Sequence, residues 1–134
     1  MISKINDGRI PILGSVAAGG LIETFSDLDE HLDMADVLRK KGVFALTVNG
    51  DSMIDAFIAD GDMVLMEPVN NSNYLRNGTI VSAMLPGSGT TLKYFFKSGN
   101  QVRLEAANQN YEPIILNAED ISIQGKLLGV WRKV

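Results

Sequence analysis

Residues 77–96 read NGTIVSAMLPGSGTTLKYFF, and this stretch indicates the class of fold. Asn77-Gly78 is a turn signal, and the run that follows it, Thr79–Leu85, is apolar and of strand length. The residues Pro86-Gly87-Ser88-Gly89 then favour a hairpin loop that leads into a second strand, Thr91–Phe96. The stretch therefore predicts two antiparallel strands joined by a tight turn.

Short segments of the same kind, separated by turn residues, extend outward in both directions. The turn signals Asn49-Gly50 and Asp60-Gly61-Asp62 punctuate the part before the hairpin. One helix is predicted over Asp33–Lys41, since Asp33 can cap its first turn and Gly42 suits its end. The expected strands span residues 43–48, 63–66, 79–85, 91–96, 101–104, 114–116 and 121–132. The pattern predicts a mostly β fold, with twisted antiparallel sheets forming a folded-over, partly open barrel and one or two short helices.

Composition and charge limit the classes of function. A chain of 134 residues with 46% apolar content is long enough for one domain with a buried core. The formal net charge of −4 lacks the basic footprint of a free-standing nucleic-acid binder. The absence of cysteine excludes disulfides, thiolate metal sites and cysteine nucleophiles. No apolar run approaches the roughly 20 residues of a membrane span, so we expect a cytoplasmic protein that does not bind a membrane.

Ser52 is a candidate nucleophile. It lies between the strand that ends at Val48 and an expected helical turn, residues 53–58, which would place its hydroxyl at a helix N-terminus. Unpaired backbone N–H groups at such an end can receive the oxyanion of an acyl-transfer reaction. The tetrapeptide at residues 49–52 also fits an ordinary turn with an N-cap serine, and by itself it favours that simpler interpretation.

A serine hydroxyl is a poor nucleophile until a neighbouring group takes its proton, so a base is required. The sole histidine, His31, lies in an acidic run and is interpreted as a solvated loop residue. Lysine can act as the base where burial lowers its pKa and leaves the amine neutral. Lys93 is a candidate because it interrupts an apolar, aromatic segment, although its amine could also extend into solvent. Lys97 has the same alternation parity, and spacing does not separate the two lysines.

Three separated motifs carry a family resemblance. They are the small-residue run Val16-Ala17-Ala18-Gly19, then Val48-Asn49-Gly50-Asp51-Ser52-Met53 with Asp60-Gly61-Asp62 after it, and finally Thr91-Leu92-Lys93. In order and spacing they resemble the self-cleaving C-terminal domain of LexA-type SOS repressors. Relatives of that domain include UmuD-type mutagenesis proteins and phage repressors of the lambda type, in the S24 group of Ser-Lys peptidases. The likeness extends from Ile10 to Arg132.

The resemblance implies a role for each matched residue. The residues so implied are the catalytic pair Ser52 and Lys93, the cleavage-site residues Ala18 and Gly19, the substrate-loop residues Val16 and Ala17, and the oxyanion-hole residues Asp51 and Ser52. Lys93 rather than Lys97 is then the general base, and no metal or other cofactor is implied. Residues 1–9 become a linker remnant, and residues 10–134 become a self-cleaving peptidase and dimerisation domain.

The resemblance also implies partners. A RecA filament on single-stranded DNA stimulates the cleavage as a co-protease, and operator DNA is bound only through an N-terminal domain that this sequence lacks. A homodimer is expected through the strand at Gly125–Arg132, whose free edge could pair with its two-fold mate. The alternative for this strand is an ordinary core or edge strand with Trp131 packed inward.

Two functional classes share these motifs. The Ala-Gly cut site favours the C-terminal part of a LexA-type repressor, which removes itself to derepress genes. The alternative is a UmuD-type self-processing accessory subunit of a translesion DNA polymerase, a group that shares the sequence of residues 50–55. That group usually cuts at Cys-Gly, and this chain has no cysteine. A type I signal peptidase shares the dyad chemistry but needs a membrane anchor, of which the sequence shows no sign.

Overall fold

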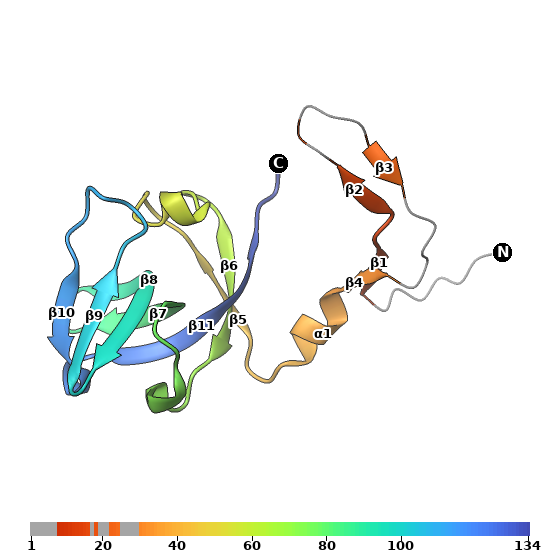
Figure 1. Cartoon of the computed structure of the whole chain (residues 1–134). Helices are drawn as coiled ribbons and strands as arrows, with labels where there is room; N and C mark the ends of the chain where they lie inside the picture. Colours follow the sequence, from red (N-terminus) through yellow and green to blue (C-terminus); the bar gives the residue numbers. More distant parts are fainter. Residues whose placement is uncertain (1–7, 17, 19–21, 25–29) are drawn as a thin grey trace. The chain divides into compact units, whose positions relative to one another are not determined.

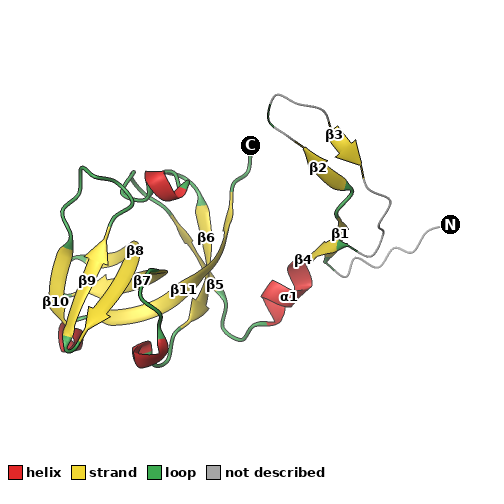
Figure 2. Cartoon of the chain, in the orientation of Figure 1, coloured by secondary structure: helices red, strands yellow, loops and turns green. Residues whose placement is uncertain are grey.

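The computed structural model describes residues 8–16, 18, 22–24 and 30–134. They fall into two compact units, which divide between Lys40 and Lys41. Strands predominate among the described elements and the helices are short, so the predicted mostly β class is confirmed (Figure 2).

The first unit consists of two short antiparallel ladders and one helix (Figure 1). Strand β1 (Arg9–Pro11) pairs with β4 (His31–Asp33), and β2 (Gly14–Val16) pairs with β3 (Ile22–Thr24). Helix α1 (Met34–Arg39) follows β4 and lies against β1. The interpretation of His31 as a loop residue is wrong, because it pairs with Pro11 in the β1–β4 ladder, although it is exposed as expected.

Asp33 begins helix α1 as the sequence predicts. Its carboxylate accepts a hydrogen bond from the Asp36 N–H at 3.0 Å, which satisfies one of the free donors of the first turn. The helix ends at Arg39, two residues before the predicted end, because Lys40 has extended backbone geometry with ψ of 127°. Gly42 follows with φ of 77°, a left-handed conformation that suits glycine.

The second unit is built on one seven-stranded antiparallel sheet with the order β10-β9-β8-β7-β11-β6-β5 (Figure 1). Its strands are β5 (Phe44–Thr47), β6 (Met63–Pro68), β7 (Thr79–Leu85), β8 (Gly89–Ser98), β9 (Gln101–Glu105), β10 (Ile114–Asn117) and β11 (Ser122–Trp131). Three single-turn 3-10 helices lie in the connections: η1 (Ile54–Ala56), η2 (Ser72–Tyr74) and η3 (Ala118–Asp120). The sheet is not closed into a barrel, in agreement with the partly open form predicted.

The hairpin predicted from residues 77–96 is confirmed. Strands β7 and β8 pair antiparallel, with Thr79 opposite Phe95 and Leu85 opposite Gly89. Gly87 and Gly89 both have positive φ, which explains why the sequence places glycines in this turn. Strand β8 is longer than predicted at both ends, since its later part also pairs with β9.

Two core clusters stabilise the second unit. The first comprises Met53, Ile58, Val64, Met66 and Ala107, and the second comprises Val81, Ala83, Phe95, Val102 and Leu104. Successive residues of β8 alternate between them, because Tyr94 packs against the first cluster and Phe95 belongs to the second. The clusters therefore cover opposite faces of the sheet at this strand.

Strand β11 lies between β7 and β6 in the sheet that the structure describes, so the free edge predicted along residues 125–132 is absent at residues 125–126 and present at residues 127–131. Residues 122–126 pair with β7, and residues 125–131 pair with β6. The crossover at Gly125 requires glycine, because a Cβ there would lie 2.9 Å from Phe44 Cζ and 3.0 Å from the Glu67 carbonyl oxygen. Beyond Lys126, β11 is paired with β6 alone among the described strands. Trp131 in this last part is 45% exposed and does not pack inward as in the alternative.

Candidate active site

Ser52 lies in the connection between β5 and β6, and backbone contacts close this connection at its base. The Val48 N–H donates to the Asp62 carbonyl oxygen, and the Gly61 N–H donates to the Val48 carbonyl oxygen, both at 2.8 Å. Gly50 has φ of 93°, and its N–H donates to an Asp60 carboxylate oxygen at 2.6 Å. The two sequence-predicted turns, Asn49-Gly50 and Asp60-Gly61-Asp62, therefore lie side by side and hold the segment between them.

The expected helical turn at residues 53–58 is shorter than predicted. It forms the three-residue 3-10 helix η1, and Phe57 ends it in the left-handed conformation with φ of 63°. Met53 caps η1 and is buried in the first core cluster, while Ser52, just before it, is half-buried. Ser52 is therefore held by a buried neighbour next to a short turn and not at the end of a full helix.

Strand β8 brings Lys93 to Ser52. The alternation of β8 turns the Lys93 side chain inward, where the residue is 8% exposed. Its Nζ atom lies 3.1 Å from Ser52 Oγ, 2.6 Å from Thr91 Oγ1 and 3.1 Å from the Leu92 carbonyl oxygen. The Lys97 Nζ atom instead donates to Asn73 Oδ1 in η2, at 2.8 Å. Of the two lysines that the sequence left unresolved, only Lys93 lies next to Ser52.

Burial lowers the pKa of Lys93 below the ordinary lysine value of 10.5. The three acceptors around Nζ are two hydroxyls and a carbonyl oxygen, and none carries a charge that would favour the ammonium form. Loss of the proton therefore costs less here than in water. Burial therefore eases formation of the neutral amine, the form that can accept a proton from the neighbouring hydroxyl.

Thr91 is a residue of the site to which sequence reasoning gave no role. It precedes Lys93 by two positions on the same strand, so the two side chains lie on one face, and its hydroxyl makes the shortest of the three contacts to Nζ. This contact fixes the end of a long, flexible side chain. The signal in the sequence was the i, i+2 spacing of a hydroxyl residue and the candidate base.

Ser52, one of the two predicted oxyanion-hole residues, lines a cavity. In the part of the chain that the structure describes, neither the Asp51 N–H nor the Ser52 N–H donates a hydrogen bond to another residue. The cavity has a volume of about 190 Å³, and its lining includes Ser52 together with the apolar side chains of Leu46, Val48, Met53, Val64 and Leu92. A nucleophile, a base, free N–H donors and a recess beside the nucleophile are the parts that acyl transfer to a peptide needs.

The cleavage-site and substrate-loop residues belong to the first unit. Val16 ends β2 and is 74% exposed, and Ala18 lies in a turn and is exposed. Ala17 of the predicted substrate loop and Gly19 of the predicted cleavage site lie outside the described residues. Val16 of the substrate loop and Ala18 of the cleavage site are thus both open to solvent.

Comparison with known proteins shows the family to which the chain belongs. A family model described as Peptidase S24-like matches residues 11–128. The chain belongs to the Peptidase S24-like family. The resemblance to the LexA/UmuD group of Ser-Lys peptidases, stated from three motifs, is confirmed.

Similar members of the family are repressors by name. The chain is 41% identical to a LexA repressor of Koribacter versatilis, over 92% of this chain and 57% of that protein. It is 42% identical to a LexA repressor of Bacillus velezensis, over 99% and 63%, and 33% identical to a transcription regulator LexA of Synechocystis, over 92% and 61%. The chain thus spans about three fifths of the length of the curated relatives it matches.

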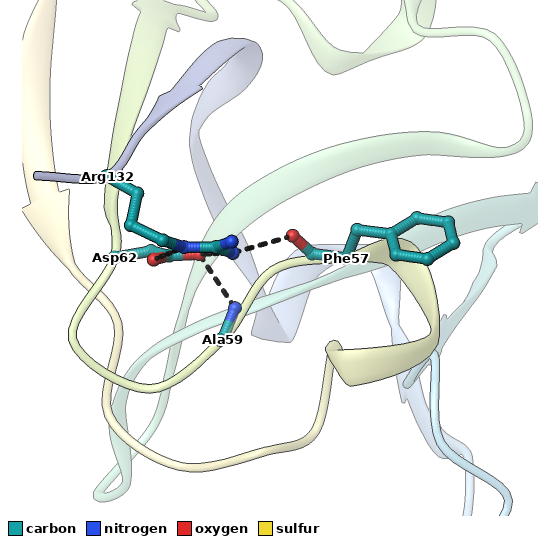
Figure 3. Close-up of polar contacts among 4 residues, drawn as sticks. All are labelled: Phe57, Ala59, Asp62 and Arg132. Atoms are coloured by element: carbon teal, nitrogen blue, oxygen red, sulfur yellow. Dashed lines mark hydrogen bonds and ion pairs between the residues drawn. The ribbon is translucent and has the colours of Figure 1, made fainter. Parts of the chain in front are cut away.

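An ion pair between Arg132 and Asp62 holds the end of the connection between β5 and β6, which contains Ser52 (Figure 3). Arg132, just after β11, contacts both carboxylate oxygens of Asp62 at 2.7 Å and donates to the Phe57 carbonyl oxygen at 3.3 Å. Asp62 also accepts from the Ala59 N–H at 2.8 Å, and its side chain is only 2% exposed. The guanidinium of Arg132, followed by the Ala59 N–H, holds the pKa of Asp62 at about 2.

Removal of this ion pair is expected to weaken the fold in acid. With Arg132 present, the folded pKa of Asp62 is below the ordinary value of 3.8, so its contribution is full above pH 4 and is lost as pH falls toward 2. In Arg132→Ala the buried carboxylate loses its partner and its pKa rises, so acid unfolding should occur at higher pH than in the wild type. Circular dichroism between about pH 5 and pH 2 measures the midpoint of acid unfolding.

The pair of Lys126, which is exposed, and Glu67, 3.7 Å apart, provides the control. Lys126→Ala removes a cation of β11 from a solvated position, so the acid midpoint should change little. An Arg132→Ala variant that unfolds at the wild-type pH would contradict the role given to the Asp62 ion pair.

Neither a metal centre nor a membrane span emerges from the described part of the chain. No group of three or more His, Cys, Asp or Glu residues in the described ranges is placed to hold a metal ion. Of the helices in those ranges, none has the length and hydrophobicity that a bilayer crossing needs.

Proposed function

We propose that this chain is a self-cleaving peptidase domain in which Ser52 and Lys93 form a catalytic dyad and the bond between Ala18 and Gly19 is the substrate. The observation that carries the proposal is the 3.1 Å contact between Ser52 Oγ and the buried amine of Lys93. Membership of a peptidase family and the uncharged surroundings of the amine support it.

The proposed reaction begins with transfer of the Ser52 hydroxyl proton to the neutral Lys93 amine. Oγ then forms a bond to the Ala18 carbonyl carbon, and the N–H groups of Asp51 and Ser52 stabilise the resulting oxyanion. The C–N bond to Gly19 breaks as the Lys93 ammonium returns the proton to the new amino group. Water then hydrolyses the ester between Ala18 and Ser52, with Lys93 again as the base.

The small residues at the cut site suit the cavity beside Ser52. Because Val16, Ala17 and Ala18 carry short side chains, a recess of about 190 Å³ beside Ser52 has room to receive them. An attached substrate also needs little binding affinity, since proximity alone accelerates such reactions by several orders of magnitude.

The test is to incubate the purified chain at alkaline pH and to identify the products. We expect two fragments, the second beginning at Gly19, and a first-order rate constant that does not change with protein concentration because the reaction is intramolecular. Mass spectrometry and N-terminal sequencing measure both. A chain that stays intact, or that is cut at another bond, would contradict the proposal.

We further propose that the domain acts within a LexA-type repressor, in which cleavage inactivates repression after a RecA filament on single-stranded DNA stimulates it. The names of the relatives favour a repressor over the UmuD-type alternative, since they are LexA repressors or a transcription regulator LexA. Operator binding is assigned to the two fifths of such a repressor that this chain does not match, because this chain carries a net charge of −4 and DNA binding favours a basic protein.

We also propose that the repressor dimerises through the end of β11. This part of the strand is paired on one side only within the described sheet, and Val130 and Trp131 are 42% and 45% exposed. Two copies could pair these edges about a two-fold axis and cover both side chains.

A further inference from the structure

The turn that contains Ser52 is held by the loop that contains Ala107, Asn108 and Tyr111, more than fifty residues away in sequence. The Asp55 N–H donates to the Ala107 carbonyl oxygen at 2.8 Å, and the Ala107 N–H donates to Met53 Sδ at 3.4 Å. Asn108 and Tyr111 extend the contact to Asp51, the residue before Ser52. The loop therefore contacts the Ser52 turn on both sides of the serine.

The contact from Asn108 acts on the peptide group that includes the Ser52 N–H. Asn108 Nδ2 donates to the Asp51 carbonyl oxygen at 3.0 Å, and the Ile54 N–H donates to the same oxygen at 3.2 Å. This carbonyl and the Ser52 N–H belong to one planar trans peptide, so they point in opposite directions. Two donors that fix the carbonyl therefore also fix the direction of the Ser52 N–H.

Asn108 is itself held in one orientation. Its Oδ1 accepts from the Asn110 N–H at 3.0 Å, and its own carbonyl oxygen accepts from the Tyr111 N–H at 3.2 Å. The amide has to present oxygen to an N–H and nitrogen to a carbonyl, so a flipped amide would lose both side-chain hydrogen bonds. The residue is half-buried, which limits competition from water.

We propose that Asn108 is a positioning residue for catalysis. This proposal rests on the proposed function: by holding the Asp51 carbonyl, Asn108 directs the Ser52 N–H toward the oxyanion. Tyr111 assists by donating its hydroxyl to the Asp51 carboxylate. That hydrogen bond raises the pKa of Tyr111 above its ordinary value of 10.0, so the donor persists into alkaline conditions. Asn108 has the larger role, because it contacts the peptide group and Tyr111 contacts a side chain.

The test compares Asn108→Asp with Asn108→Ala in the self-cleavage assay. Asn108→Asp keeps the acceptor for the Asn110 N–H but removes the donor to Asp51, and Asn108→Ala removes both. We expect both variants to cleave about tenfold to a hundredfold more slowly, less than the effect of deleting an oxyanion donor outright. In Asn108→Ala the plateau of the pH–rate profile should fall while its midpoint stays unchanged, since the contacts of Lys93 remain.

Asn71→Asp is the matched control, because Asn71 Oδ1 likewise accepts from a backbone N–H two residues on, that of Asn73, at 3.0 Å. It adds the same charge away from Ser52 and should cleave at the wild-type rate. An Asn108→Asp variant that cleaves as fast as the wild type would show that only the loop turn matters and would overturn the inference, while the proposed function stands. A wild-type chain that does not cleave itself would refute both.

Discussion

Replacing Ser52 with alanine is expected to abolish self-cleavage, and replacing Lys93 with methionine to slow it about a hundredfold to ten-thousandfold. Ser52→Ala removes the attacking atom, and Lys93→Met removes the amine 3.1 Å away while it keeps most of the buried stem. The domain should remain folded, because Ser52 is half-buried and a methionine avoids the cost of a buried ammonium group. Rates of fragment formation, with circular dichroism as the check on folding, measure the effect.

Lys97→Met is the matched control for the base. Lys97 lies four residues further along β8 with the same parity, but its amine donates to Asn73 and not to Ser52. The variant should cleave at nearly the wild-type rate. Loss of cleavage in Lys97→Met, or retention of it in a folded Lys93→Met, would contradict the assignment of the base.

The rate of self-cleavage is expected to rise about tenfold for each pH unit below the pKa of Lys93 and then to level off. Only the neutral amine accepts a proton, and acid protonates it, so the rate must increase with pH. Because burial lowers this pKa, the midpoint of the rise should lie below 10.5. The groups around Nζ are the Ser52 and Thr91 hydroxyls and the Leu92 carbonyl oxygen, and none of them is charged.

The measurement is the first-order rate constant across neutral to strongly alkaline pH, with Ser52→Ala at each pH to subtract non-enzymatic hydrolysis. A flat profile would exclude a lysine base. A midpoint at or above pH 10.5 would contradict a base whose pKa is lowered by burial.

The sheet was largely predictable because turn residues and alternation are local signals. Asn77-Gly78 and the Pro86–Gly89 loop place the β7–β8 hairpin without knowledge of any other strand. The position of β11 was not predictable in this way, since an apolar strand has the same sequence pattern at the edge of a sheet and inside it. Its register depends on Gly125, whose missing Cβ matters only once Phe44 and Glu67 are next to it.

The candidate site shows the same division between local and distant information. The motifs identified Ser52 and Lys93, but the parity of β8 fits Lys97 equally, and only the fold places its amine against Asn73. Asn108 gave no signal because its partner, Asp51, is 57 residues away. The acceptor is also a backbone carbonyl, which every residue has, so the type of residue at position 51 does not indicate the contact.

The interior position of β11 has a consequence for the order of biosynthesis. Lys93 lies on the β10–β7 side of the sheet and Ser52 on the β6–β5 side, and β11 is the one described strand that bonds to both. A nascent chain on the ribosome therefore cannot join the two sides through strand pairing until residues 122–131 have emerged. The strand pairing that supports the proposed dyad would therefore be completed only after β11 has been synthesised, which would favour cleavage by finished polypeptides over unfinished ones.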